Sequence, residues 1–366
     1  MINRRDFSLA ASALGLMCLS SYVNAQGKRV FRAANPNAVL DAQQAFATCG
    51  RHPRLGYFAA EGVDLEYVNM SSIVQAMLSI ATSQADTGSL APALFLPAVA
   101  KEPGLGLIAA YKWLPRNANI VVVNADSPIK TLRDTVGKRI GIRNQGDGGV
   151  TQLQLMYAEL GLPVNDINFV PVGDVGVAAT ALKDNKVDAY VTFDTVGGRM
   201  EALGFAIRYL SLPPQYAKLG SGWFGFRKKD VQDNRKQVAA FCRAMAKSTL
   251  FAHTNLGQAL NIHWALYPDS KPAGKTLDES RKEIEIILGQ RKDNWIRWPD
   301  DADQRWGAST AAEWKALIDI TAKSTNNPQL AQQIGDVGNV FTNDLVDEIN
   351  NFDKAAVIKQ AREFKL

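Results

Sequence analysis

Residues 126–162 read DSPIKTLRDTVGKRIGIRNQGDGGVTQLQLMYAELGL and contain the clearest structural signal in the chain. They predict a strand at Arg139 to Ile142, a polar loop rich in glycine at residues 144–149, and then a helix. The helix is indicated by apolar residues at i, i+3, i+4 and i+7, namely Leu153, Met156, Tyr157 and Leu160. Glycine lets the backbone approach a ligand, and the first N–H groups of a helix have no intrahelical partners, so this loop could hold an anionic or carbonyl group. Asp147 or Thr151 could instead cap the helix.

Strands and helices alternate on both sides of this stretch, as far as residue 227. This alternation predicts parallel sheets joined by right-handed crossovers. Strands are expected at residues 30–34, 64–68, 84–89, 105–111, 119–124, 168–172, 187–193 and 220–227. Helices are expected at residues 38–57, 73–80, 178–183 and 196–203, and the chain is mostly helical from Asp233. The repeated order favours two similar lobes, with hinge crossings near residues 115–117 and 220–222.

Three motifs carry a family resemblance. They are SPIKTLRDTVGKRIG at residues 127–141, LGYFAAEGVDLEYV at 55–68 and SIVQAMLSIATSQADTG at 72–88. With them, the chain from about Val30 to Arg227 resembles the substrate-binding proteins of nitrate, sulfonate and taurine ABC importers, a group that includes NMT1/THI5-like proteins. The resemblance implies an α/β fold of the periplasmic binding protein type II kind, with two α/β lobes, a hinge crossed twice and a helical C-terminal extension. We expect lobe I at 26–116 plus 223–366, and lobe II at 117–222.

The N-terminus has the pattern of a signal peptide. Arg4 and Arg5 precede an uncharged apolar stretch at residues 7–19, and Val23-Asn24-Ala25 fits a cleavage site, so residues 1–25 are expected to be removed. The paired arginines also resemble a twin-arginine signal, which would mean export after folding. A retained membrane anchor is the minor alternative. We therefore predict a periplasmic protein, exported by the general or the twin-arginine route.

Composition excludes several classes of protein. The chain has 366 residues, 46% hydrophobic and 21% charged, which suits a soluble protein of two domains. Its net charge of +5 is spread without a basic block, so nucleic-acid binding is not expected. None of the three histidines has metal-ligand spacing to another histidine, cysteine or carboxylate, so neither a metal nor a cofactor is predicted.

Cysteine allows one enzymatic alternative. Cys49 and Cys242 would remain in the mature chain, where the periplasm permits a disulfide that the sequence cannot establish, although Cys242 lies on an apolar helical face typical of a buried thiol. Cys49-Gly50-Arg51-His52 could supply a nucleophile. The resemblance also implies that some relatives of this fold are enzymes, namely a sulfinate-releasing hydrolase and a pyrimidine synthase. The closely spaced cysteines that mark the pyrimidine synthase are missing here.

Polar residues after the strands are the candidate ligand contacts. In open α/β sheets, ligands bind beyond the carboxyl ends of strands. Asparagine and serine side chains, with free N–H groups, can hold a carboxylate, sulfonate or amide. Taken singly, each is more often a cap or turn residue; Asp194, for instance, could face a cationic group or cap the next helix. The candidate set is Asn35, Asn37, Ser71, Ser72, Ser89, Tyr111, Gly146, Asp147, Gly148, Gly149, Phe193, Asp194 and Trp223.

The expected function is the periplasmic solute-binding component of an ABC importer. It would capture a small organic ligand between the lobes as a monomer, deliver it to the inner-membrane permease and perform no chemistry on it. An anion is favoured, with aromatic and sulfonate ligands as candidates, although the same donors suit a neutral heterocycle. The alternatives are an enzyme with Cys49 as nucleophile, a protein that binds a pyrimidine precursor of thiamine, and an exported sensor.

Overall fold

The computed structural model describes residues 28–145 and 148–366, and in this part of the chain the strands form two five-stranded sheets. The predicted signal peptide, Gly146 and Asp147 lie outside the described residues. The first sheet has the order β2-β1-β3-β10-β4. Its strands are β1 Arg29–Asn35, β2 Val63–Asn69, β3 Thr87–Leu90, β4 Leu107–Leu114 and β10 Gly222–Arg227. The second has the order β7-β6-β8-β5-β9, with β5 Asn119–Asn124, β6 Arg139–Ile142, β7 Asn168–Pro171, β8 Ala189–Phe193 and β9 Ile207–Tyr209.

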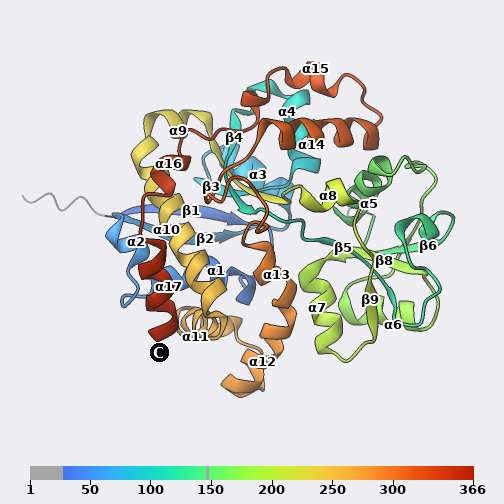
Figure 1. The fold of residues 1–366 in the computed structure, drawn as a ribbon, viewed down its shortest axis with the longest axis horizontal. Helices are drawn as coiled ribbons and strands as arrows, with labels where there is room; N and C mark the ends of the chain where they lie inside the picture. Colours follow the sequence, from blue (N-terminus) through green and yellow to red (C-terminus); the bar gives the residue numbers. More distant parts are fainter. Residues whose placement is uncertain (1–27, 146–147) are drawn as a thin grey trace, which may run out of the picture.

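The two sheets follow the same plan. In each, the first three strands are parallel and the fourth position holds an antiparallel strand, β10 in the first sheet and β5 in the second. The chain passes from β4 in the first sheet to β5 in the second, and returns from β9 to β10. Figure 1 shows β1 and β2 on the left of the molecule and β5, β8 and β9 on the right. The predicted fold of two α/β lobes with a hinge crossed twice is therefore confirmed.

Helices cover both faces of the first sheet. Side chains alternate along β1, so Ala33 belongs to the core under one layer of helices and Ala34 to the core under the other. The first layer contains α1 Ala45–Thr48, α2 Tyr57–Ala60, α10 Arg235–Thr254, α11 Leu256–Leu266, α16 Val346–Ile349 and α17 Lys354–Glu363. The second layer contains α3 Ile73–Ala81, α4 Pro92–Lys101, α14 Ala311–Ser324 and α15 Leu330–Ile334.

The second sheet lies among its own helices, α5 Gly148–Glu159, α6 Val175–Lys183 and α7 Asp194–Ala202. Short helices complete the connections: α8 Pro214–Lys218, α9 Lys228–Asp233, and 3-10 turns at Pro103–Leu105, Leu132–Thr135, Pro268–Ser270 and Val337–Asn339. None of the helices in the described ranges combines the length and the apolarity needed to cross a membrane.

The C-terminal helices contact both lobes. Helices α12 Leu277–Ile287 and α13 Gly289–Asn294 pack against α7, while α14 packs against α5 as well as α4. Figure 1 shows α12, α13 and α7 together below the junction of the two sheets, and α14 above it. The extension therefore joins the lobes in addition to the two hinge crossings.

Two local predictions were wrong. The helix expected at residues 38–57 is instead a series of short turns, with 3-10 turns at Ala42–Gln44 and Cys49–Arg51 on either side of α1. Pro53, which lacks an N–H group, and Gly56, with φ of +63°, end the series. The helix expected at 196–203 begins earlier, at Asp194, and its N-cap is Phe193.

Candidate functional site

Asn35 organises the carboxyl ends of β1 and β2. It is buried at 1% exposure, and its amide donates to Asn69 Oδ1 at 2.9 Å and to the carbonyl of Val39 at 3.1 Å. Its own Oδ1 accepts from Gln44 at 3.3 Å and lies 3.5 Å from the Asn37 amide. Both polar ends of Asn35 thus fix the loop that follows β1.

Ser71 and Ser72 lie at the start of α3. Ser72 Oγ accepts from Gln75 N at 3.2 Å and caps the helix, and the Ser71 hydroxyl donates to Gln75 Oε1 at 2.8 Å. Ser89 lies in β3, where its backbone pairs with Phe224. All three are at the carboxyl side of the first sheet, as predicted from the strand positions.

In the second lobe, Phe193 and Gly148 come together. Gly148 and Gly149 begin α5, and a Cβ atom added to Gly148 would lie 3.8 Å from Cζ of Phe193. The aromatic ring at the end of β8 thus lies beside the first turn of α5. Arg143 follows β6, and its Nε atom lies 3.7 Å from Oδ2 of the exposed Asp174 carboxylate.

Asp194 is fully enclosed by protein groups. Its carboxylate accepts from Arg291 Nε at 2.9 Å and Nη2 at 2.5 Å, from Asn294 at 2.8 Å, and from the N–H of Thr195 at 2.7 Å. Arg291 and Asn294 belong to α13 of the C-terminal extension, so this buried ion pair attaches α7 of lobe II to that extension. Contact of Asp194 with a ligand stays a prediction.

An ion pair that the sequence does not predict links the two lobes directly. Arg199 of α7 donates to Asp41 Oδ2 at 3.0 Å. Asp41 itself caps the 3-10 turn after β1 and forms a capping box with Gln44, a pattern that its D-x-x-Q spacing could have indicated. Its partner could not have been found in this way, because it lies 158 residues further along the chain. The pair shows that the loop after β1 meets the helix after β8.

The predicted aromatic contacts lie deep in the first lobe. Trp223 and Tyr111 are both 1% exposed. The indole rings of Trp223 and Trp314 pack with their centroids 4.9 Å apart, and Trp223 Nε1 donates to Ser309 Oγ at 2.8 Å. Trp113, also in β4, is less buried, and its ring stacks on that of Phe46 with the ring centroids 4.9 Å apart. Ligand contact by Tyr111 and Trp223 stays a prediction.

Cys49 lies in the core of the first lobe. It has no exposed surface, its thiol donates to the carbonyl of Ser248 at 3.5 Å, and burial raises the pKa of this thiol to about 12. His52 Nδ1 accepts from the N–H of Arg54 at 3.3 Å. Cys49 and Cys242 are both free and buried, and burial raises the pKa of Cys242 as well.

Across residues 28–145 and 148–366, no group of three or more histidine, cysteine or acidic residues could hold a metal.

Comparison with known proteins identifies the family. Residues 52–259 match the model of the NMT1/THI5-like family, and this is more than half of the chain. The chain therefore belongs to the NMT1/THI5-like family, as the three motifs predicted. No curated protein sequence matches the chain.

Solved structures share the fold. The alkanesulfonate-binding protein SsuA of Xanthomonas axonopodis pv. citri, bound to MOPS, is 17% identical with a TM-score of 0.58, covering 86% of this chain and 98% of that one. The periplasmic aliphatic sulphonate binding protein SsuA of Escherichia coli is 14% identical with a TM-score of 0.59, covering 86% and 92%. A desulfurization enzyme, DSZB, is also similar, at 17% identity and a TM-score of 0.53, covering 88% and 99%. The fold thus occurs in binding proteins and in an enzyme.

Proposed function

We propose that this protein is the periplasmic solute-binding component of an ABC importer, which holds a small organic anion between its two lobes and performs no reaction on it. The observation that carries the proposal is the meeting of the two carboxyl edges, where Asp41 after β1 contacts Arg199 of α7, the helix that follows β8. In such sheets these edges are where ligands bind. The domain boundaries that go with it are lobe I at 26–116 plus 223–366 and lobe II at 117–222.

The groups at these edges suit an anion. The first lobe supplies asparagine and serine side chains, and the second supplies the first N–H groups of α5 beside the ring of Phe193. The guanidinium of Arg199 also lies at the junction, where it is paired with Asp41. The two SsuA structures are described as sulfonate-binding proteins, which supports a sulfonate among the candidate anions. A pyrimidine remains the alternative ligand within the NMT1/THI5-like family.

We infer that the two crossings of the hinge move together. Its two crossings are hydrogen-bonded to one another, because Ser221 Oγ accepts from Ala118 N and donates to the carbonyl of Arg116, both at 3.1 Å. Asn117 donates to the carbonyl of Tyr216 at 3.1 Å. Crossings that are tied together favour rotation of one lobe against the other about a common axis.

The enzymatic alternative has weaker support. At neutral pH a thiol with a pKa of about 12 is almost wholly protonated, so Cys49 is a poor nucleophile. Cys49 also has no exposed surface for a substrate to contact. The DSZB fold match keeps the alternative testable, because that protein is an enzyme.

A binding panel tests the proposal. Mature protein would be titrated calorimetrically with alkanesulfonates, aromatic sulfonates, aromatic carboxylates and pyrimidines. Each bound compound would then be recovered, and its mass would be measured by mass spectrometry. We expect one equivalent of an anion to bind and to be recovered unchanged. Recovery of a converted product would overturn the binding role and favour an enzyme.

Transport itself needs a separate test. Export to the periplasm, by the general or the twin-arginine route, and delivery to a permease belong to the same proposal. If it is right, deletion of the gene should abolish uptake of the bound compound by whole cells. Normal uptake, with loss of a response to that compound, would favour the sensor alternative.

A further inference from the structure

A cavity lies in the first lobe, lined by β4 and by segments near the C-terminus. Its volume is about 380 Å³, within the range of small-molecule sites. We call it the C-terminal pocket. Its walls come from β4, the connection after β4, α10, α17 and the segment 295–307, and no lining residue comes from 117–222. The cavity therefore belongs to the first lobe alone, and most of its lining lies beyond residues 52–259, which match the family model.

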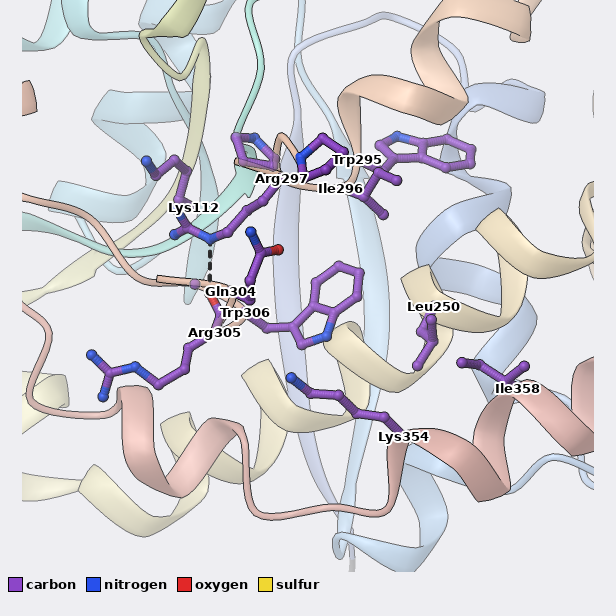
Figure 2. A pocket seen from close by; sticks show the side chains of 13 residues that line it. Lys112, Leu250, Trp295, Ile296, Arg297, Gln304, Arg305, Trp306, Lys354 and Ile358 are labelled. Atoms are coloured by element: carbon purple, nitrogen blue, oxygen red, sulfur yellow. Dashed lines mark hydrogen bonds between the residues drawn. The ribbon is translucent and has the colours of Figure 1, made fainter. Parts of the chain in front are cut away.

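The C-terminal pocket combines apolar walls with positive charge. Figure 2 shows the indole of Trp306 at its centre, with Trp295 and Ile296 above and Leu250 and Ile358 to the right. Its lining also includes four basic residues, Lys112, Arg297, Arg305 and Lys354. None of the lining residues within the described ranges is acidic. Such a site matches a flat apolar body that carries a negative group.

The basic side chains differ in how far their charge is already compensated. Lys112 pairs with Glu313 at 2.5 Å, and Arg305 pairs with Asp303 at 2.9 Å and Asp347 at 2.7 Å. Lys354 is exposed at the start of α17, and its side chain makes no hydrogen bond or ion pair within the described residues. Its ammonium is therefore available to a ligand.

Arg297 adds a cation that is mainly held by uncharged groups. Its guanidinium donates to the carbonyl of Arg305 at 3.0 Å, drawn in Figure 2, and to that of Ala308, while the nearest carboxylate, that of Asp301, is 4.0 Å away. Backbone carbonyls position the guanidinium without neutralising it. Arg297 and Lys354 together give the pocket its net positive charge.

The aromatic wall is fixed before any ligand arrives. Asn350 accepts from the N–H of Trp306 at 2.9 Å and donates to its carbonyl at 3.0 Å. The next residue, Gly307, accepts from Lys112 N at 3.0 Å and has φ of +80°, and a Cβ atom there would lie 2.8 Å from the ring of Tyr111. A wall held in this way loses little conformational entropy when it binds a ligand.

We propose that the C-terminal pocket is a second ligand site, which binds a small aromatic anion with its ring against Trp306 and its negative group near Lys354 and Arg297. The site shares no residue with the predicted ligand contacts between the lobes. A ligand there would contact Pro115 at the first hinge crossing, so its occupancy is expected to influence lobe closure.

Naphthalene-1-sulfonate is a suitable probe, with the uncharged naphthalene-1-sulfonamide as its matched control. Binding to the mature protein would be measured by calorimetry and by quenching of tryptophan fluorescence. We expect the sulfonate to bind and the sulfonamide to bind at least about fivefold more weakly, because it lacks the charge that Lys354 and Arg297 would meet. Equal binding of the two compounds, or no binding of the sulfonate, would overturn the proposal.

Three variants locate the bound probe. Lys354→Glu should weaken sulfonate binding about tenfold, and Trp306→Leu should weaken it and reduce the quenching, which Trp295 would still report in part. Lys359→Glu makes the same charge change on the same helix, at an exposed residue outside the pocket lining, and should leave binding within about twofold. An equal loss in both lysine variants would indicate only long-range charge and contradict the site. Loss of binding in Arg199→Ala instead of Lys354→Glu would place the probe between the lobes, which overturns this proposal and supports the proposed function.

Discussion

Buried titratable side chains set how the protein responds to pH. His263 has no exposed surface, and its Nδ1 lies 2.8 Å from the Thr48 hydroxyl. Burial lowers the pKa of His263 from 6.5 to about 4, against a smaller opposing effect of the Asp41 charge. Between these two values the unfolded chain binds a proton that the folded chain does not. The stabilisation is therefore complete above about pH 6.5 and is lost as the pH falls towards 4.

The size of this effect can be measured by substitution. The shift corresponds to roughly 3 kcal/mol in the free energy of unfolding between pH 6.5 and 4. His263→Gln keeps a polar partner for Thr48 but cannot be protonated, so its unfolding free energy should fall less steeply with acid than that of the natural protein. Urea unfolding at several pH values would show this. Identical slopes for the two proteins would contradict the assignment, and His52→Gln, at a more exposed site, serves as the control.

The two thiols of the mature chain should be unreactive while it is folded. Cys49 and Cys242 are both free and buried, and burial raises the pKa of both thiols. Ellman's reagent at pH 8 is therefore expected to find no reactive thiol in native protein. In guanidinium chloride it should find both. No reaction in guanidinium would mean that a disulfide joins them, and rapid reaction of native Cys49 would revive the nucleophile hypothesis.

Helix α7 packs closely against α12. A Cβ atom added to Gly198 would lie 2.6 Å from the carbonyl oxygen of Ile287, at the end of α12. Gly198→Ala should therefore force α12 away from α7 and cost about 1–3 kcal/mol of stability. Gly289→Ala is the control, since nothing lies within 4 Å of the added atom, and helix propensity favours alanine there. Thermal and urea unfolding of both variants would test this, and equal stabilities would contradict the close packing.

Local patterns predicted the strands and the long helices well. The strand at Arg139–Ile142 and the apolar face of α3 follow directly from spacing, because those elements bury one face in a regular manner. The helix prediction for residues 38–57 was wrong because the geometry of the loop after β1, and not the spacing of apolar residues in the segment, decides its shape. Serine and asparagine positions after strands were also predictable, since they depend on strand ends alone.

The contacts that join the lobes were not predictable. The sequence predicts Asp194 as a ligand contact or a helix cap, yet its carboxylate is paired with Arg291, 97 residues away. The same holds for the contact of Asp41 with Arg199. Neither partner differs from an ordinary surface arginine in the sequence, because what pairs them is the packing of the C-terminal extension and α7 around the junction.

At the scale of the whole molecule, the ion pair between Asp41 and Arg199 should favour the closed arrangement. It is partly exposed, with side chains 28% and 35% accessible, so its contribution is limited to about 1 kcal/mol. Arg199→Ala should therefore weaken binding of the native ligand by up to about fivefold, measured by calorimetry. Arg139→Ala removes a comparable pair with Asp188 inside lobe II and should leave affinity unchanged. Equal losses in both variants would show that the Asp41 pair has no special role in closure.

The most direct test of the binding role is native mass spectrometry of the mature protein, purified gently from the periplasm. We predict a stoichiometric adduct of a small organic anion, released on denaturation with an unchanged mass and retained less well by Arg199→Ala than by Arg139→Ala. A bare protein that also shows no thermal shift with sulfonates, aromatic carboxylates or pyrimidines would contradict it.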